Sequence, residues 1–408
     1  MQSSPKSLRL HIGLFGRRNV GKSSLLNAMT RQQVSIVSPT AGTTTDPVEK
    51  PMELLPLGPV LFVDTAGLDD EGALGQQRIA RSRAVLERVD LGVIVTEAGA
   101  WGPFEEGPLA ELKGRKVPVM VVYNKADLQA PSPEERGARE AQGCAVVSAA
   151  AAEGRGVLEL REALLRLAPS DHFDCRHLVS DLVPSGELAV LVVPIDKEAP
   201  KGRIILPQVM AIRDLLDGQA MALVCQEHEL ARALAGLARP PALVVTDSQA
   251  FQKVASEVPE GVPMTGFSVL MARFQGDLAS LAEGALRMRC LKPGDRVLIA
   301  ETCTHHPIAD DIGRVKIPRW LNAFAGGELD FAHVQGRDFP ADLSPYRLIV
   351  HCGNCTGNRR EMMSRIHRAR EAGVPMTNYG LAIACSLGIL ERALRPFPEA
   401  HALLEARA

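Results

Sequence analysis

Short apolar runs recur along the chain and alternate with stretches in which apolar residues follow helical spacing. The runs predict strands at Leu8–Phe15, Val60–Val63, Val119–Tyr123, Ala145–Val147, Leu188–Val193, Ala220–Val224, Ala242–Thr246, Arg296–Ala300, Asp330–Val334 and Arg347–Val350. The helical spacing predicts helices at Ser24–Met29, Val157–Leu167, His228–Leu237, Ser248–Val258, Ile317–Phe324 and Asn358–Ala372, and a largely helical Met264–Arg289. Strands that alternate with helices indicate parallel sheets, so the expected fold class is α/β.

The length of 408 residues predicts roughly two or three domains. A break at Pro169–Asp171 ends the first series of strands and helices. We therefore expect a first domain at residues 1–170 and two smaller α/β domains with mainly parallel sheets, at residues 171–268 and 269–408. The middle domain shows no catalytic set, which makes it a candidate for self-association.

Composition excludes some classes of function. A net charge of −2 gives no pull towards nucleic acid or an anionic membrane, and an aromatic content of 4% disfavours a protein that stacks on single-stranded bases. No apolar run approaches the roughly 18 residues of a membrane span. Met1–Arg9 has no signal-peptide pattern, so we expect a cytoplasmic protein whose eight cysteines stay reduced.

The first predicted strand runs into Gly16–Ser23, with the sequence G-R-R-N-V-G-K-S. The spacing G-x-x-x-x-G-K-S between a strand and a helix is that of a P-loop, in which backbone N–H groups surround phosphate oxygens. Lys22 is expected to reach the β- and γ-phosphates, and the Ser23 hydroxyl is expected to ligate Mg²⁺. The N-terminus of the following helix also favours an anion.

Three further boxes follow other predicted strands. Asp64–Gly67 places a carboxylate at a strand end, where it would serve the Mg²⁺ ion. Asn124–Asp127 is an N-K-x-D sequence and resembles the guanine box of GTPases, while Ser148–Ala150 resembles the last base-side box. Gly42–Asp46 resembles switch I of Era- and MnmE-like GTPases, where Thr44 would complete the Mg²⁺ shell.

These boxes predict a P-loop GTPase domain that binds GTP or GDP with Mg²⁺. The expected nucleotide-binding residues are Gly16, Asn19, Val20, Gly21, Lys22, Ser23, Ser24, Thr44, Asp64, Gly67, Asn124, Lys125, Asp127, Ser148 and Ala149. Leu68 stands where Ras-type GTPases carry the glutamine that orients water. By resemblance to MnmE-like GTPases, Asn19 would help to hold a K⁺ ion; the alternative is that Asn19 only shapes the loop. Lys22, Thr44, Asp64 and Asn19 are the expected catalytic residues.

Two sequences near the C-terminus suggest a metal centre. Glu301–His306, E-T-C-T-H-H, and His351–Cys355, H-C-G-N-C, each follow an apolar run, so two neighbouring parallel strands would bring them together. Cys303, Cys352 and Cys355 are the cysteines that cluster. One interpretation is a structural zinc site with three cysteines and a histidine. The other is an iron–sulfur cluster whose fourth position is taken by a weaker ligand from among the neighbouring histidines and Glu301.

The GTPase boxes, the middle-domain sequence Ala199–Arg203 and the two cysteine sequences together resemble the HydF family of [FeFe]-hydrogenase maturation GTPases, over essentially the whole chain. The resemblance implies slow, K⁺-stimulated GTP hydrolysis and a homodimer formed by the middle domain. It implies a [4Fe–4S] cluster on Cys303, Cys352 and Cys355, with Glu301 and His305 as candidates for a labile fourth ligand. The family carries a diiron subcluster precursor, made with two radical-SAM maturases, to apo-[FeFe]-hydrogenase.

Two rival hypotheses belong to other classes of function. The MnmE-like switch region also fits a GTPase of tRNA or ribosome maturation with a structural zinc site. The second rival is a GTPase that acts through protein–protein interactions and whose metal-binding fold has no chemical role. Zinc in a colourless protein favours the first rival, and iron with sulfide in a brown, oxygen-sensitive protein favours the HydF interpretation.

Overall fold

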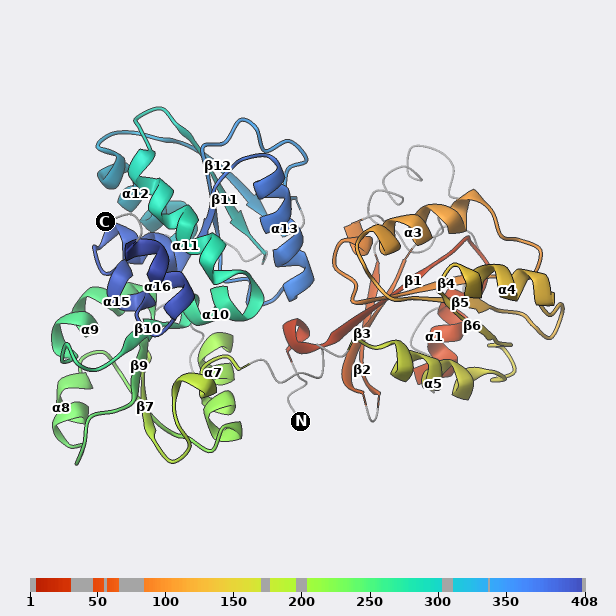
Figure 1. The fold of residues 1–408 in the computed structure, drawn as a ribbon, viewed down its shortest axis with the longest axis horizontal. Helices are drawn as coiled ribbons and strands as arrows, with labels where there is room; N and C mark the ends of the chain where they lie inside the picture. The colour runs from red at the N-terminus through yellow and green to blue at the C-terminus, as the bar shows by residue number, and fades with distance from the viewer. Residues whose placement is uncertain are drawn as a thin grey trace. The chain divides into compact units, whose positions relative to one another are not determined.

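The computed structural model describes residues 5–30, 47–54, 57–65, 84–169, 177–195, 204–302, 311–336 and 338–405. The chain divides into two compact units, Met1–Cys175 and Arg176–Ala408 (Figure 1). The expected α/β class with mainly parallel sheets is confirmed in both units. No helix in the described ranges is long and apolar enough to cross a membrane.

The first unit contains one six-stranded sheet in the order β2-β3-β1-β4-β5-β6. Its strands are β1 (Leu10–Phe15), β2 (Val48–Leu54), β3 (Gly58–Asp64), β4 (Leu91–Thr96), β5 (Val119–Tyr123) and β6 (Ala145–Ser148). Only β2 runs antiparallel to its neighbour, β3. Every residue of β1, β4 and β5 is buried, as expected for parallel strands covered on both faces, and this burial explains their continuous apolar sequences.

Helices cover both faces of this sheet (Figure 1). They are α1 (Lys22–Thr30), α3 (Pro103–Gly114), α4 (Pro133–Ala141) and α5 (Val157–Leu167). Leu25 of α1 and Leu160 of α5 belong to one apolar core, whereas Leu109 of α3 belongs to the core on the opposite face. Each fully buried leucine contributes about 2 kcal/mol. The carboxyl ends of β1, β3 and β5 are held between these two cores.

The second unit contains two four-stranded sheets, in the orders β10-β9-β7-β8 and β12-β11-β13-β14, and all of their paired strands are parallel. The strands of the first sheet are β7 (Leu188–Val192), β8 (Met221–Cys225), β9 (Leu243–Thr246) and β10 (Met264–Gly266). Those of the second are β11 (Arg296–Glu301), β12 (Asp330–Gln335), β13 (Leu348–His351) and β14 (Met376–Asn378).

The described helices of the second unit are α7 (Leu206–Asp217), α8 (Leu230–Ala235), α9 (Phe251–Glu257), α10 (Phe267–Gln275), α11 (Leu278–Arg287), α12 (Ile317–Ala325), α13 (Arg359–Glu371), α14 (Tyr379–Ser386), α15 (Leu390–Leu394) and α16 (Pro398–Glu405). Three of them, α11, α13 and α14, begin after a residue whose side chain caps the first turn. The side chains of Asn358 and Asn378 accept hydrogen bonds from the first turns of α13 and α14. These two helices therefore start at fixed positions beside β13 and β14.

The largely helical stretch expected at Met264–Arg289 is partly wrong. It begins with strand β10, which pairs with β9, and then divides into α10 and α11. Gly266 is the last residue of the strand, and a Cβ there would overlap the ring of Phe251. Asp277 caps α11 and so separates it from α10. Helix α10 also spans the expected domain boundary between residues 268 and 269.

Candidate functional site

The loop between β1 and α1 is folded around the ammonium group of Lys22. Lys22 is buried, and its Nζ donates to the carbonyl oxygens of Gly16 at 2.9 Å and Arg17 at 2.7 Å. Asn19 has a φ of 59°, the left-handed conformation that asparagine and glycine adopt most readily. The loop thus surrounds the cation with its own carbonyl oxygens.

Two glycines of this loop are required by close contacts. Gly16 has a φ of +147°, and a Cβ on it would overlap the carbonyl oxygen of Val95 in β4. Gly21 has a φ of +90°, and a Cβ on it would overlap Nδ2 of Asn124. Any other residue would push the loop away from β4 and from the N-K-x-D box.

Ser23 and Asp64, the two residues expected to hold magnesium, contact each other. The Ser23 hydroxyl donates to Asp64 Oδ2 at 2.7 Å, and Asp64 is 8% exposed. Burial raises the pKa of the Asp64 carboxyl, while the Ser23 hydrogen bond and the charge of Lys22 act in the opposite direction. Asp64 Oδ1 is buried and has no hydrogen-bond partner among the described residues. An unsatisfied carboxylate oxygen beside a serine hydroxyl suits a divalent cation.

Asn124 joins the phosphate-binding and base-binding parts of the site. Its Nδ2 donates to the carbonyl oxygen of Val20 at 2.8 Å, and its Oδ1 accepts from the backbone N–H of Ala151 at 3.1 Å. The backbone N–H of Ala126 donates to the carbonyl oxygen of Ala149 at 3.0 Å. The predicted N-K-x-D and last boxes therefore lie side by side, at the ends of β5 and β6.

The charged residues of the N-K-x-D box are more open to solvent. Lys125 has a φ of 55°, and its Nζ lies 2.6 Å from Glu97 Oε1. Asp127 is exposed, and the Ser148 hydroxyl accepts from the Arg136 guanidinium at 3.2 Å. Asp127 is thus open to solvent, whereas Ser148 is partly buried beside Arg136. Thr44, Gly67 and Leu68 lie outside the described residues.

The two predicted metal-binding sequences follow β11 and β13, which are the two inner strands of the sheet β12-β11-β13-β14. Strands β11 and β13 are parallel neighbours, and Ala300 pairs with His351. The backbone N–H of Cys352 donates to the carbonyl oxygen of Ala300 at 2.9 Å, and the N–H of Thr302 donates to Cys352 Sγ at 3.2 Å. The expectation that the strands preceding these two stretches are parallel neighbours is therefore confirmed, and the convergence of the ligands stays a prediction. Cys303 and His305 lie outside the described residues.

Asn354 fixes the turn between the two cysteines. It is buried, with a φ of 52°, and its Nδ2 donates to the carbonyl oxygen of Asn358 at 3.0 Å. Its Oδ1 accepts from the Thr302 hydroxyl at 2.8 Å. A Cβ at Gly357 would overlap the same Oδ1. The turn is thus tied both to the end of β11 and to the start of α13.

The thiols themselves fit a metal that binds thiolate sulfur. Cys352 and Cys355 are free of disulfides. Burial raises the pKa of the Cys355 thiol to about 11, the charge of Cys352 adds to this, and hydrogen bonds from the backbone of Cys355 and Thr356 oppose it. A metal would displace that thiol proton, and the N–H groups directed at both sulfurs would stabilise the thiolates. The donor set therefore suits zinc or an iron–sulfur cluster.

Glu301 precedes Thr302, whose N–H contacts Cys352 Sγ, and its carboxylate is held at both oxygens. It is 5% exposed; Tyr379 donates to its Oε1 at 3.0 Å, and Gln335 Nε2 donates to its Oε2 at 3.1 Å. A Cβ at Gly313 would overlap the Tyr379 hydroxyl. Sequence reasoning missed Tyr379 and Gln335, which lie 78 and 34 residues from Glu301 and carry no local signal.

His351 has a supporting role. Its Nε2 accepts from the Arg365 guanidinium at 2.8 Å, so Nδ1 carries the proton and donates to the carbonyl oxygen of Cys352 at 2.8 Å. Burial, with the charge of Arg365, lowers its pKa to about 3. Both ring nitrogens are thus engaged, which makes His351 a neutral hydrogen-bonding neighbour of the thiols. Within the described ranges, no three metal-ligating side chains converge, since Cys303 and His305 are not among them.

Protein-family models match three parts of the chain. Residues 11–125 match the 50S ribosome-binding GTPase model, residues 178–276 the hydrogen maturase F dimerization domain and residues 279–396 the hydrogen maturase F tetramerization domain. The two hydrogen maturase F models together cover more than half of the chain. They do not favour the alternative of a tRNA- or ribosome-maturation GTPase with structural zinc.

Curated relatives and solved structures resemble the N-terminal part. The tRNA modification GTPase MnmE of Paraburkholderia xenovorans is 38% identical over 160 residues, 39% of this chain and 34% of that protein. The MnmE of Heliobacterium modesticaldum is 35% identical over 161 residues, again 39% and 34%. The chain spans about a third of the length of these curated relatives. Era from Aquifex aeolicus is 28% identical over 39% of this chain and 56% of its own, with a TM-score of 0.36. The FeoB G-domain from Methanococcus jannaschii is 25% identical over 39% and 98%, with a TM-score of 0.31.

Proposed function

The chain belongs to the HydF family of hydrogenase maturation GTPases, and from this premise we propose that it is a GTP-binding carrier of an iron–sulfur cluster. The cluster is a [4Fe–4S] centre held by Cys303, Cys352 and Cys355. The cargo is a diiron subcluster precursor, built with two radical-SAM maturases and delivered to apo-[FeFe]-hydrogenase. The observation that carries the proposal is the pairing of Ala300 with His351, which sets Cys352 beside the end of β11.

Three thiolates leave one iron of such a cluster with a position for an exchangeable ligand, and that is the chemistry the cluster supplies. Glu301 and His305 are the candidates for this position. Glu301 is supported by its place next to Thr302, whose N–H contacts Cys352 Sγ. Tyr379 and Gln335 hold the Glu301 carboxylate when it is not a ligand. An exchangeable position is what a carrier requires, because the cargo must be both accepted and released.

The first unit is a P-loop GTPase domain that binds GTP or GDP with Mg²⁺. Lys22 contacts the phosphates, while Ser23 and Asp64 hold the magnesium ion, with Thr44 completing its shell in the GTP state. K⁺ stimulation by way of Asn19 belongs to the proposal and is supported by the similarity of this domain to MnmE GTPases. GTP turnover controls partner association and release, since γ-phosphate orders the switch segments of such domains and hydrolysis relaxes them.

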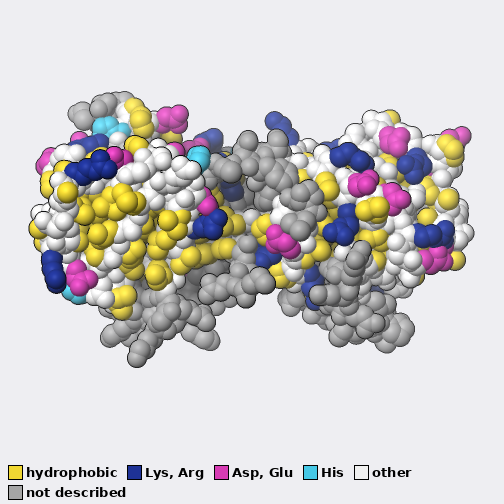
Figure 2. Space-filling model, turned by 90° about the horizontal axis from the view of Figure 1, so that it is seen from below, with side chains coloured by type: hydrophobic (Ala, Val, Ile, Leu, Met, Phe, Trp, Pro, Cys, Tyr) yellow, Lys and Arg dark blue, Asp and Glu magenta, His cyan; other side chains and the backbone are white. Residues whose placement is uncertain are grey.

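Self-association belongs to the proposal as well. Strand β8 stands at one end of its sheet and exposes Met221 (51%) and Val224 (44%), and α7 exposes Leu216 (60%). Figure 2 shows hydrophobic side chains gathered over the second unit on the face seen from below, the side on which Figure 1 places β7, α7 and α8. An exposed edge strand with apolar neighbours favours a second copy of the same sheet. The homodimer forms through this surface.

Anaerobic purification with metal and sulfide analysis tests the cluster. We expect iron and sulfide, no stoichiometric zinc, and an EPR signal of a reduced cluster. Changing Cys303, Cys352 and Cys355 together to serine should remove the iron. The matched control is Cys290→Ser, because Cys290 is a free cysteine that lies outside this turn. Iron that persists in the triple variant, or zinc in its place, contradicts the proposal; activation of apo-hydrogenase then tests delivery.

A further inference from the structure

The segment of residues 97–106, which comprises the loop after β4 and the first turn of α3, contacts both loops of the nucleotide site. Glu97 Oε1 lies 2.6 Å from Nζ of Lys125 in the N-K-x-D box. At the other end of the segment, Glu105 Oε1 and Oε2 accept from Nε and Nη2 of Arg17 in the P-loop, at 2.9 and 3.0 Å. One short stretch is thus bonded to the phosphate-binding and the base-binding parts of the site.

Glu105 is the buried anchor of this arrangement. Its side chain is fully buried, and its Oε2 also accepts from the backbone N–H of Gly102 at 2.8 Å, at the start of α3. Bidentate pairs between a guanidinium and a carboxylate are among the strong charge-assisted hydrogen bonds. Loss of one partner leaves a buried charge without compensation, so such a pair fixes the geometry of both chains that it joins.

Arg17 connects this anchor to the phosphate-binding lysine. Its guanidinium is held by Glu105 and lies over the Phe104 ring, 5.2 Å from the centroid. Its backbone carbonyl accepts from Lys22 Nζ at 2.7 Å. The position of the carbonyl oxygens that face the ammonium group therefore depends on a contact with α3.

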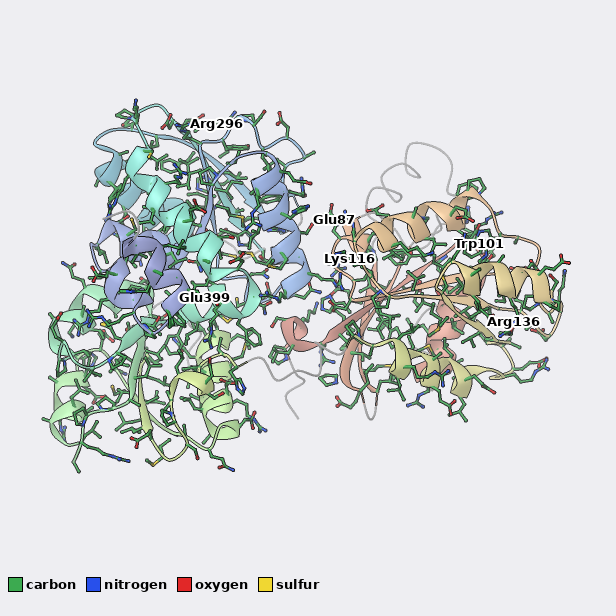
Figure 3. All side chains as sticks on the ribbon, in the orientation of Figure 1. Glu87, Trp101, Lys116, Arg136, Arg296 and Glu399 are labelled. Atoms are coloured by element: carbon green, nitrogen blue, oxygen red, sulfur yellow. The ribbon has the colours of Figure 1, made fainter. Side chains whose placement is uncertain are left out.

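The rest of the segment is fixed to α4. The backbone N–H of Gly99 donates to Glu135 Oε1 at 2.7 Å. Trp101 lies between α3 and α4 (Figure 3), its Nε1 donates to Glu106 Oε1 at 2.5 Å, and the Arg139 guanidinium covers its ring at 4.2 Å. The segment is therefore a rigid support rather than a free loop.

We propose that Glu105 is a positioning residue of the nucleotide site. By way of Arg17 it sets the first half of the P-loop. Glu105 also fixes the P-loop relative to the base-binding box. The connection is the backbone of residues 97–102, because Glu97 at its start pairs with Lys125. GTP and GDP use the same P-loop geometry, so Glu105 contributes equally to the binding of both and does not act on the chemical step.

The test is a double-mutant cycle on the GTPase reaction of the full chain. Arg17→Lys keeps the charge but loses the bidentate geometry, and Glu105→Gln removes the charge. Each variant should raise KM for GTP and Kd for GDP about tenfold, with kcat changed by less than about twofold. The double variant should bind GTP and GDP no more weakly than the more severe of the two single variants, because both changes break the same contact. The control is Glu111→Gln, which breaks the half-buried pair of Glu111 with Arg115 at the other end of the same helix.

Thermal unfolding of each variant without nucleotide separates positioning from loss of the fold. If Glu105→Gln does not fold, Arg17→Lys decides the matter, since Arg17 is 30% exposed. Unchanged KM and Kd in folded Arg17→Lys, strictly additive losses in the cycle, or a fall in kcat at constant KM would each overturn the proposal. A selective loss of GTP but not GDP binding would overturn it too.

Discussion

The phenol of Tyr379 donates a hydrogen bond to Glu301 Oε1 over 3.0 Å and so connects the first residue of α14 to the last residue of β11. Gln335, the last residue of β12, holds the other oxygen. Both donors are uncharged, and each carboxylate oxygen keeps a second lone pair. The Glu301 carboxylate is therefore held by two uncharged donors, one from α14 and one from β12.

Replacing Tyr379 by phenylalanine should make Glu301 a stronger competitor at the proposed exchangeable iron position, because one of its two protein hydrogen bonds is lost. We expect added imidazole to alter the EPR spectrum of the reduced cluster only at about tenfold higher concentration, since a hydrogen bond to a charged group contributes roughly 1.5–3 kcal/mol. Tyr346→Phe, at the opposite end of the same sheet, is the control. Equal imidazole titrations in the two variants would argue against a role for Tyr379.

Replacing Asn19 by glycine should abolish K⁺ stimulation without loss of nucleotide binding. Asn19 has a φ of 59°, which glycine adopts without strain, so the backbone is kept and only the carboxamide is removed. Hydrolysis in K⁺ should fall to the rate measured in Na⁺, while the Kd for GDP stays within about twofold. Persistent K⁺ stimulation in this variant would mean that Asn19 only shapes the loop.

Replacing Lys22 by alanine should abolish GTP hydrolysis and, with it, nucleotide-controlled exchange of partners. The ammonium group that faces the Gly16 and Arg17 carbonyl oxygens is the phosphate contact that this change removes. Binding of the variant to immobilised apo-hydrogenase should no longer respond to GTP. Partner exchange that continues unchanged in Lys22→Ala would count against our assignment of GTP turnover to partner release.

Replacing Met221 or Val224 by lysine should disrupt self-association. These side chains project from the edge strand β8, where a charge opposes pairing with a second copy. We expect the dissociation constant measured by analytical ultracentrifugation to rise roughly tenfold or more. The control is Leu158→Lys, at another exposed apolar residue, in α5; it should leave the molecular mass of the assembly in solution unchanged. A dimer that survives both β8 changes must use another surface.

Glu49 should make the GTPase unit sensitive to acid. Burial alone would raise the pKa of this carboxyl, but hydrogen bonds and charges from Lys6 and Arg88 outweigh it and lower the pKa from 4.5 to about 2. Because the folded-state pKa is depressed, the stabilisation is present above pH 4.5 and is lost as the pH falls towards 2. Glu49→Gln should cost about 2 kcal/mol near neutral pH.

The difference in unfolding free energy between the native protein and Glu49→Gln should shrink steadily below pH 4.5. Urea unfolding of the two proteins at a series of pH values measures it. Glu53→Gln, on the same strand β2, is the matched control. A difference between Glu49→Gln and the native protein that does not depend on pH would show that the charge pairing contributes nothing.

Most of the frame could be predicted from the sequence because the elements that carry the site are buried parallel strands. Val119–Tyr123 and Val157–Leu167 have the predicted bounds, and the pairing of β11 with β13 follows from two apolar runs that precede cysteine-rich sequences. By contrast, β10 has only three residues, too few to show alternation, so the sequence pattern does not separate it from the helix that follows.

The supporting contacts could not be predicted, since each depends on tertiary structure. Tyr379 and Gln335 reach Glu301 from α14 and β12, and Glu105 reaches Arg17 across 88 residues. The contacts of Glu301 and the contact of Arg17 produce no recognisable pattern in local residue spacing or composition. The motifs locate the groups that contact ligands, whereas the residues that orientate them emerge only when distant elements are brought together.

The pairing of Ala300 with His351 also sets how the chain between them can change. Backbone hydrogen bonds, and not the length of the intervening segment, keep Glu301 next to Cys352. Insertions or deletions in the connection between β12 and β13 should therefore be tolerated, provided that Cys303, His305, β12 and α12 remain. A single residue gained or lost within either strand would turn its side chains to the opposite face and separate the two halves.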